Sequence, residues 1–152
     1  MRKIIALRLT KITSYCERIL TIILHSLGDI LYGIRWICSQ LDKLARATFL
    51  DATEEQLRSV IGGFLFLRFL NPIIVTPDGN NIITKKVDKV KRRNLTLIAK
   101  VLQNMSNGVQ FAKKEAFMIS LNTFLNNYRF LMDDIFEQII QVYIFNFIFN
   151  QS

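Results

Sequence analysis

Proline is absent from the first 71 residues, and the 152-residue chain contains only two prolines, Pro72 and Pro77. A sandwich of β-sheets needs many tight turns, which proline and glycine usually make, and the chain has only six glycines. Its apolar residues instead recur at the three- and four-residue spacing of one helix face, as in Ile12, Cys16, Ile19, Ile23 and Leu27. The sequence therefore predicts an all-α fold.

The same periodicity sets the expected helices, and 51% hydrophobic residues are enough for one folded domain with its own core. A capping box within residues 51–56 should start the third helix, and Asn71 before Pro72 should stop it. The other helices are expected over residues 7–26, 33–47, 94–109, 114–128 and 130–149. The helix over residues 114–128 should direct Phe117, Leu121, Phe124 and Leu125 inward.

Positive charge is concentrated in the middle of the chain. Residues 68–132 carry eleven basic and three acidic side chains, whereas residues 133–152 carry three acidic and no basic ones. Residues 85–93 alone hold six positive charges and one negative charge. Such a field attracts nucleic acid, an anionic membrane or an acidic protein surface, and composition does not choose among these. A solvated basic run remains the simpler interpretation of residues 85–93.

Arg68 occupies the next position of the apolar stripe formed by Leu57, Ile61 and Phe64. If apolar groups enclose its guanidinium, its five donors need acceptors, because an unpaired buried charge costs about 3–5 kcal/mol. The simplest interpretation is a structural arginine that binds C-terminal carbonyl oxygens of a helix in its own domain.

A second polar set lies on the helix expected over residues 94–109. Its inward face should carry Leu95, Ile98, Leu102, Met105 and Val109. Its outer face carries Lys100, Gln103, Asn104 and Asn107. Asparagine is a poor helix former, so this face suggests a surface for polar contacts.

No enzyme constellation appears in the sequence. There is no glycine-rich phosphate loop, no nucleophile set and no carboxylate pair at motif spacing. Cys16 and Cys38 are 22 residues apart in apolar helical patterns, and His25 is the only histidine, so we expect two reduced core thiols, no metal site and a cytoplasmic protein. Two classes of protein remain as predictions: a regulatory protein-binding domain and a basic, helical nucleic-acid-binding protein.

Residues 64–75, FLFLRFLNPIIV, strongly resemble the signature of Ras-type GTPase-activating domains, in which Phe-Leu-Arg runs into Asn-Pro-Ala-Ile. Residues 97–107 and 111–122 resemble the second block of that family, in the usual order and spacing. Residues 32–41 and 60–64 resemble the IQGAP-like branch. The resemblance covers roughly residues 9–134, with Ile73 in place of the family alanine.

The resemblance implies an all-helical domain whose groove receives a small GTPase of the Ras superfamily in its GTP-bound form, with no cofactor and no nucleic acid. It implies that Arg68 supports the loop of an arginine finger through main-chain carbonyls, beside Asn71 and Pro72. It also implies that Lys100 lies at the groove and pairs with Glu115. Gln103 and Asn107 match the polar neighbours of that lysine. Membrane contact would then come through the GTPase.

The resemblance places the catalytic arginine finger upstream of the signature, and no arginine of this sequence matches it. We therefore expect residues 1–134 to form the C-terminal part of the domain, N-terminally incomplete, and residues 135–152 to form an unassigned apolar helical tail. The resulting prediction is a GTPase activator by family, or a GTPase binder without the finger. The alternative is a basic, all-helical nucleic-acid-binding protein, although the aromatic residues lie within apolar stripes and not among lysines.

Overall fold

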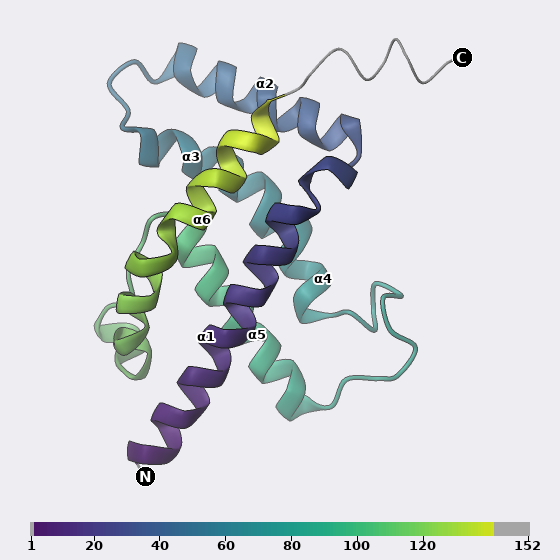
Figure 1. Ribbon diagram of the computed structural model, residues 1–152, viewed down its shortest axis with the longest axis vertical. Helices are drawn as coiled ribbons and strands as arrows, with labels where there is room; N and C mark the ends of the chain where they lie inside the picture. The colour runs from purple at the N-terminus through teal and green to yellow at the C-terminus, as the bar shows by residue number, and fades with distance from the viewer. Residues whose placement is uncertain (1, 142–152) are drawn as a thin grey trace.

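The computed structural model describes residues 2–141, and this part of the chain is helical, with no strand (Figure 1). Its elements in chain order are α1 (Arg2–His25), η1 (Leu27–Asp29), α2 (Tyr32–Thr48), α3 (Glu54–Gly62), η2 (Gly63–Leu70), α4 (Asn71–Val75), α5 (Lys89–Ser106), η3 (Lys113–Leu121) and α6 (Asn122–Ile140). The predicted all-α fold is confirmed.

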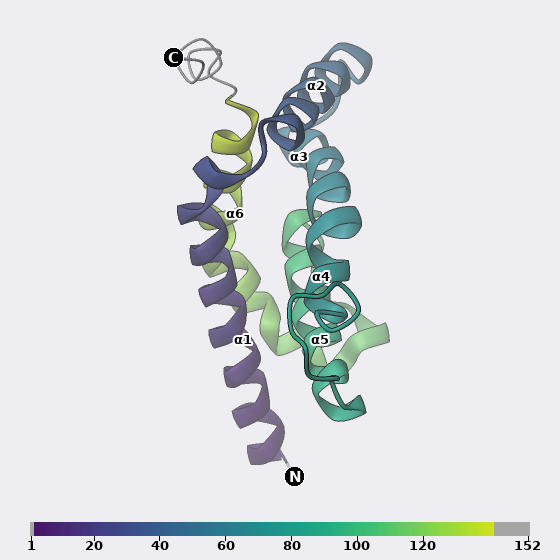
Figure 2. The same cartoon turned by 90° about the vertical axis from the view of Figure 1, so that its right-hand side faces the viewer.

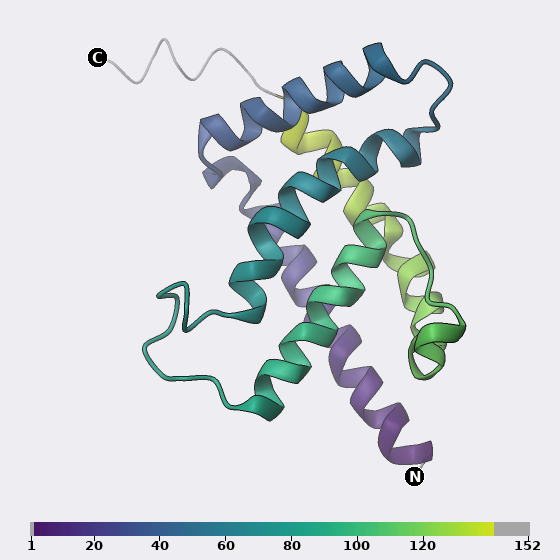
Figure 3. The same ribbon diagram turned by 180° about the vertical axis from the view of Figure 1, so that it is seen from behind.

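The helices form two layers with α2 across one end. Figure 2 shows α1 and α6 side by side in one layer, and the continuous helix α3–η2–α4 beside α5 in the other. Helix α2 packs on α3 and α6, and so closes the end where the layers meet (Figure 3). The segment between α4 and α5 leaves this body as a long loop at its edge.

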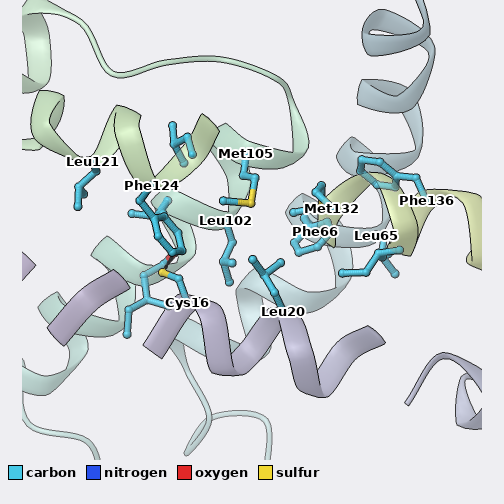
Figure 4. Packing of buried hydrophobic residues seen from close by; sticks show 14 of the residues in the cluster. Cys16, Leu20, Leu65, Phe66, Leu102, Met105, Leu121, Phe124, Met132 and Phe136 are labelled. Atoms are coloured by element: carbon cyan, nitrogen blue, oxygen red, sulfur yellow. Dashed lines mark hydrogen bonds between the residues drawn. The ribbon is translucent and has the colours of Figure 1, made fainter. Parts of the chain in front are cut away.

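The core lies between the two layers, and the residues labelled in Figure 4 come from α1, η2, α5, η3 and α6. Phe66 of η2 meets Phe136 of α6 edge to face, with ring centroids 6.4 Å apart. Cys16 and Cys38 are buried and unbonded to each other, which confirms the prediction of reduced core thiols. Burial raises the pKa of the Cys16 thiol to about 12 and that of Cys38 to about 11.

The third helix begins as predicted but does not end as predicted. Thr53 caps α3 and exchanges hydrogen bonds with Gln56, which confirms the capping box. Asn71 and Pro72, however, do not stop the helix, which runs on from Glu54 to Val75. The reason is the π-helical segment η2, in which the Asn71 N–H donates to the Phe66 carbonyl five residues back. Pro72 then lies in the first turn of α4, where a residue does not need to donate a backbone N–H.

This helix is long and apolar enough, by length and composition alone, to cross a membrane. Apolar core helices share that property. Here one face of the helix is packed into the protein core through Leu57, Ile61, Leu65 and Phe66.

The start of α5 and the inward face of residues 113–121 also differ from the sequence prediction. Helix α5 begins at Lys89, within the basic run, because Asp88 caps it by accepting a hydrogen bond from the Lys91 N–H. Phe117 was expected inward but is exposed, and Met118 is buried instead. Residues 113–121 form a 3₁₀ helix with three residues per turn, so the inward positions fall three apart, at 118 and 121.

Within the described residues, one helix runs across the boundary between the two helices expected over residues 114–128 and 130–149. Helix α6 runs from Asn122 to Ile140 and crosses the predicted division at residue 134. Ile135, Phe136 and Ile139 are part of the same core as the residues before them. The helix predicted over residues 130–149 lies partly outside the described residues, from 142 onward.

Candidate functional site

Three of the predicted site residues form one hydrogen-bonded network between α4 and α5. The Asn71 Nδ2 donates to Gln103 Oε1 at 2.8 Å, and the Gln103 Nε2 donates to Asn107 Oδ1 at 2.9 Å. Gln103 and Asn107 meet because they are four residues apart on α5, and Asn71 reaches them from the first turn of α4. The hydrogen bond between Asn71 and Gln103 therefore connects residues 64–75 with residues 97–107, the two segments that resemble family motifs.

Ser106 is a member of this network that the sequence analysis missed. Its hydroxyl donates to the Gln103 carbonyl at 2.9 Å, and it accepts from Gln103 Nε2 at 3.2 Å. Ser106 is buried, which is unusual for a serine on the last turn of a helix. Its spacing of three from Gln103 was the available signal.

Gly62 brings α3 against α5 beside the network. A Cβ built at Gly62 would lie 2.9 Å from the Ser106 carbonyl oxygen and 3.1 Å from its Oγ. The two helices can approach this closely only because Gly62 has no side chain. This contact fixes the position of Ser106, and with it the end of α5 that carries Gln103 and Asn107.

Lys100 and Glu115 form the ion pair that the resemblance implied. The Lys100 Nζ lies 2.6 Å from Glu115 Oε1, and 42% of the Lys100 side chain remains exposed. Glu115 has non-helical backbone angles at a kink in η3, which directs its carboxylate to α5. Lys100 precedes Gln103 by three residues on the same helix, so the charged pair and the amide network share one face of α5.

Arg68 does not occupy the enclosed position that the sequence predicted. It is exposed, and no hydrogen bond or ion pair joins its guanidinium to the described residues. A π-helical turn contains more residues than an α-helical turn. Each residue of η2 after Gly63 is therefore rotated less far around the helix axis than regular α-helical spacing predicts. Leu65 and Phe66 therefore enter the core, and Arg68 rotates into solvent.

Asn71 retains one unused polar atom. The residue is 8% exposed, and its Oδ1 is buried without a hydrogen-bond partner among the described residues. Pro72 contributes its carbonyl to the end of α4, where it accepts from the Thr76 hydroxyl at 2.8 Å. The hydrogen bond from Thr76 holds the end of α4 in place. The orientation of Asn71, on the first turn of the same short helix, is therefore fixed.

The arrangement offers hydrogen-bonding groups and charge but no catalytic set. No group of three or more metal-ligating side chains occurs within residues 2–141. A hollow of about 530 Å³ lies near the turn between α2 and α3, lined by residues 48–52, Gln56, Leu57 and Val60, and contains none of the predicted site residues. The arrangement suits a macromolecular surface contact better than small-molecule chemistry.

Comparison with known proteins gives a family match. The sequence profile of the family described as "GTPase-activator protein for Ras-like GTPase" matches residues 1–107. The Ras GTPase-activating-like protein rgaA of Dictyostelium discoideum is 33% identical over 140 residues, which is 92% of this chain and 17% of that protein.

Two further relatives match over shorter segments. The mouse Ras GTPase-activating-like protein IQGAP2 is 37% identical over 72% of this chain and 7% of its own length. Neurofibromin-A of Dictyostelium discoideum is 51% identical over 47% of this chain and 8% of its own length. The chain thus spans less than a fifth of the length of each of these relatives.

Proposed function

Because the chain belongs to the family of GTPase activators for Ras-like GTPases, we propose that it binds the GTP-loaded form of a small GTPase through the face of α5 that carries Lys100, Gln103 and Asn107. The observation that carries this proposal is the joining of the Lys100–Glu115 ion pair and the Asn71–Gln103–Asn107 network on one half-buried helix face. The acidic surface of a GTPase would complement the net charge of +8 over residues 68–132.

The geometry supports two different roles within this face. Lys100 offers a charge that is half exposed and held in direction by Glu115, so it can meet a carboxylate of the partner without losing its orientation. The amide network offers fixed donors and acceptors that define the register of docking. Both roles are protein-binding roles, and hydrolysis would take place on the nucleotide of the GTPase.

Stimulation of hydrolysis in this family rests on charge supplied to the phosphoryl-transfer transition state. An arginine finger contributes about 10³–10⁵ in rate, and no arginine of these 152 residues matches it. Arg68 is proposed as the support of such a finger loop, and its exposed guanidinium leaves its donors available for carbonyls of that loop. The 152 residues alone should therefore bind the GTPase and accelerate hydrolysis only weakly.

A binding experiment tests the proposed face. Lys100→Glu should weaken binding to a Ras-type GTPase loaded with a non-hydrolysable GTP analogue by at least about tenfold, or about 1.4 kcal/mol. Lys43→Glu makes the same charge change at an exposed position on α2 and is the matched control. Because a partly exposed ion pair is worth about 0–1 kcal/mol, the Lys100 variant should remain folded.

Equal weakening by the two variants would show that only net charge matters and would contradict the proposed face. Loss of folding in Lys100→Glu would show that the ion pair supports the core. In that case Lys100→Gln, which adds no like charge beside Glu115, carries the same binding test. Tighter binding to duplex DNA than to the GTPase at physiological salt, with a steep salt dependence, would favour the nucleic-acid alternative.

A further inference from the structure

The loop between α4 and α5 presents apolar and basic side chains to solvent together. We call residues 79–93 the basic loop; it comprises the outer part of this connection and the first turn of α5, at the edge of the molecule (Figures 1 and 3). All of its residues except Val87 and Arg92 are exposed. Ile82, Ile83 and Val90 are 62%, 42% and 71% exposed, which places three aliphatic side chains in water on one short segment.

The base of the basic loop is held closed by Asp78. One oxygen of its carboxylate accepts from the Val87 N–H at 3.0 Å, and both accept from the Arg92 Nη2, at 2.8 and 2.9 Å. Arg92 also donates to the Val75 carbonyl at the end of α4. These bonds tie the end of α4 to the start of α5, so the loop projects from a fixed base.

The charge of the basic loop is largely uncompensated. Asp88 is its only acidic residue, and its carboxylate caps α5 and pairs with Lys91. Among the described residues, no acidic side chain pairs with Lys85, Lys86, Lys89 or Arg93. Lys89 and Arg93 are four apart on α5 and share one face, with Val90 beside Lys89.

We propose that the basic loop docks on an anionic lipid surface. Its lysines and Arg93 would lie at negatively charged headgroups, while Ile82, Ile83 and Val90 would enter the boundary with the acyl chains. Nucleic acid would satisfy the charges but would leave the aliphatic side chains in water, and residues 79–93 contain no aromatic residue on which a base could stack. The combination of exposed aliphatic and unpaired basic groups therefore favours a lipid surface over nucleic acid.

The lipid contact does not depend on the proposed GTPase contact. Lys100 lies eleven residues beyond Lys89 on α5, about 16 Å along the helix axis, and on nearly the same side of it, because eleven residues are close to three full turns. Each contact can be tested alone, because vesicle binding needs no GTPase and GTPase binding in solution needs no lipid.

Sedimentation of the 152-residue protein with vesicles tests the proposal. Binding should be strong to vesicles of phosphatidylcholine with phosphatidylserine and weak to phosphatidylcholine alone. Because one lysine near an anionic surface strengthens binding about fivefold, Lys85→Glu with Lys86→Glu should weaken it by at least about 25-fold. Lys113→Glu with Lys114→Glu makes the same charge change at another exposed lysine pair and should change it little.

The aliphatic part of the proposal has its own variant. Ile82→Ser with Ile83→Ser keeps every charge, and it should weaken binding to the phosphatidylserine vesicles by about tenfold. Circular dichroism should show all variants folded, because the altered side chains are exposed.

Three outcomes would overturn the proposal. The first is equal binding to both kinds of vesicle, and the second is equal weakening by the two lysine pairs. The third is tighter binding to a DNA duplex than to the phosphatidylserine vesicles, with no effect of the isoleucine changes on either.

Discussion

Replacing Gly62 with alanine should destabilise the protein, whereas the same replacement at the neighbouring Gly63 should stabilise it. Both glycines have helical backbone angles, so neither needs the conformational freedom of glycine. They differ in what a new Cβ would meet. At Gly62 it would lie 2.9 Å from the Ser106 carbonyl oxygen, and at Gly63 it would meet nothing within 4 Å.

The magnitude follows from two opposing effects. Alanine in a helix is favoured over glycine by about 0.5–1 kcal/mol, and both variants gain this amount. At Gly62 the helices must also separate by a few tenths of an ångström, because the obstructing atom belongs to the backbone of α5; overpacking of this kind costs about 1–3 kcal/mol. The two variants should therefore differ by about 1–3 kcal/mol in the free energy of unfolding.

Urea unfolding followed by circular dichroism measures this difference. Since 1 kcal/mol shifts the midpoint of a domain of this size by about 2–4 °C, thermal unfolding offers an independent check. Gly62→Ala should also weaken GTPase binding more than Gly63→Ala, because Ser106 bonds directly to Gln103. If the two alanine variants proved equally stable, the close approach of α3 and α5 at Gly62 would be refuted.

Three other properties of the chain can be tested in the same way. Hydrogen bonds from the Val87 N–H and Arg92 hold the pKa of Asp78 at about 2, below its ordinary value of 3.8. The stability that these bonds confer is therefore complete above about pH 4 and is lost as the pH falls toward 2. In thermal melts, the melting temperature of Asp78→Asn should lack this decrease between about pH 4 and pH 2. Burial raises the pKa of both cysteine thiols, so native protein at pH 8 should react with iodoacetamide far more slowly than protein unfolded in urea, and rapid labelling would contradict the core assignment. Gly108 has φ +66° at the end of α5, so Gly108→Ala should lower the melting temperature, and an unchanged value would contradict the left-handed cap.

The sequence was sufficient for those features that depend on local spacing. The capping box at Thr53 needs only residues three apart, and the apolar face of α5 through Ile98, Leu102 and Met105 needs only regular helical turns. The Lys100–Glu115 pair joins two elements, and it was predictable only through the family resemblance. Regular local structure and a known family pattern thus account for what was predicted correctly.

The errors arise where the helix departs from its regular turn. The position of Arg68 and the passage of the helix through Pro72 both depend on the π-helical segment Gly63–Leu70. The exposure of Phe117 depends on the 3₁₀ turns of η3. The errors at Arg68 and Phe117 come from applying 3.6 residues per turn to segments with another pitch.

We propose that this chain binds the GTP-loaded form of a Ras-type GTPase in preference to the GDP-loaded form, through the α5 face that carries Lys100. The most direct test is titration calorimetry of the 152-residue protein against one GTPase, loaded with either GDP or a non-hydrolysable GTP analogue. We expect clear binding to the GTP-analogue form, at least about tenfold weaker binding to the GDP form, and loss of that preference in Lys100→Glu. Equal affinity for both forms, or a preference unchanged in the Lys100 variant, would contradict the claim.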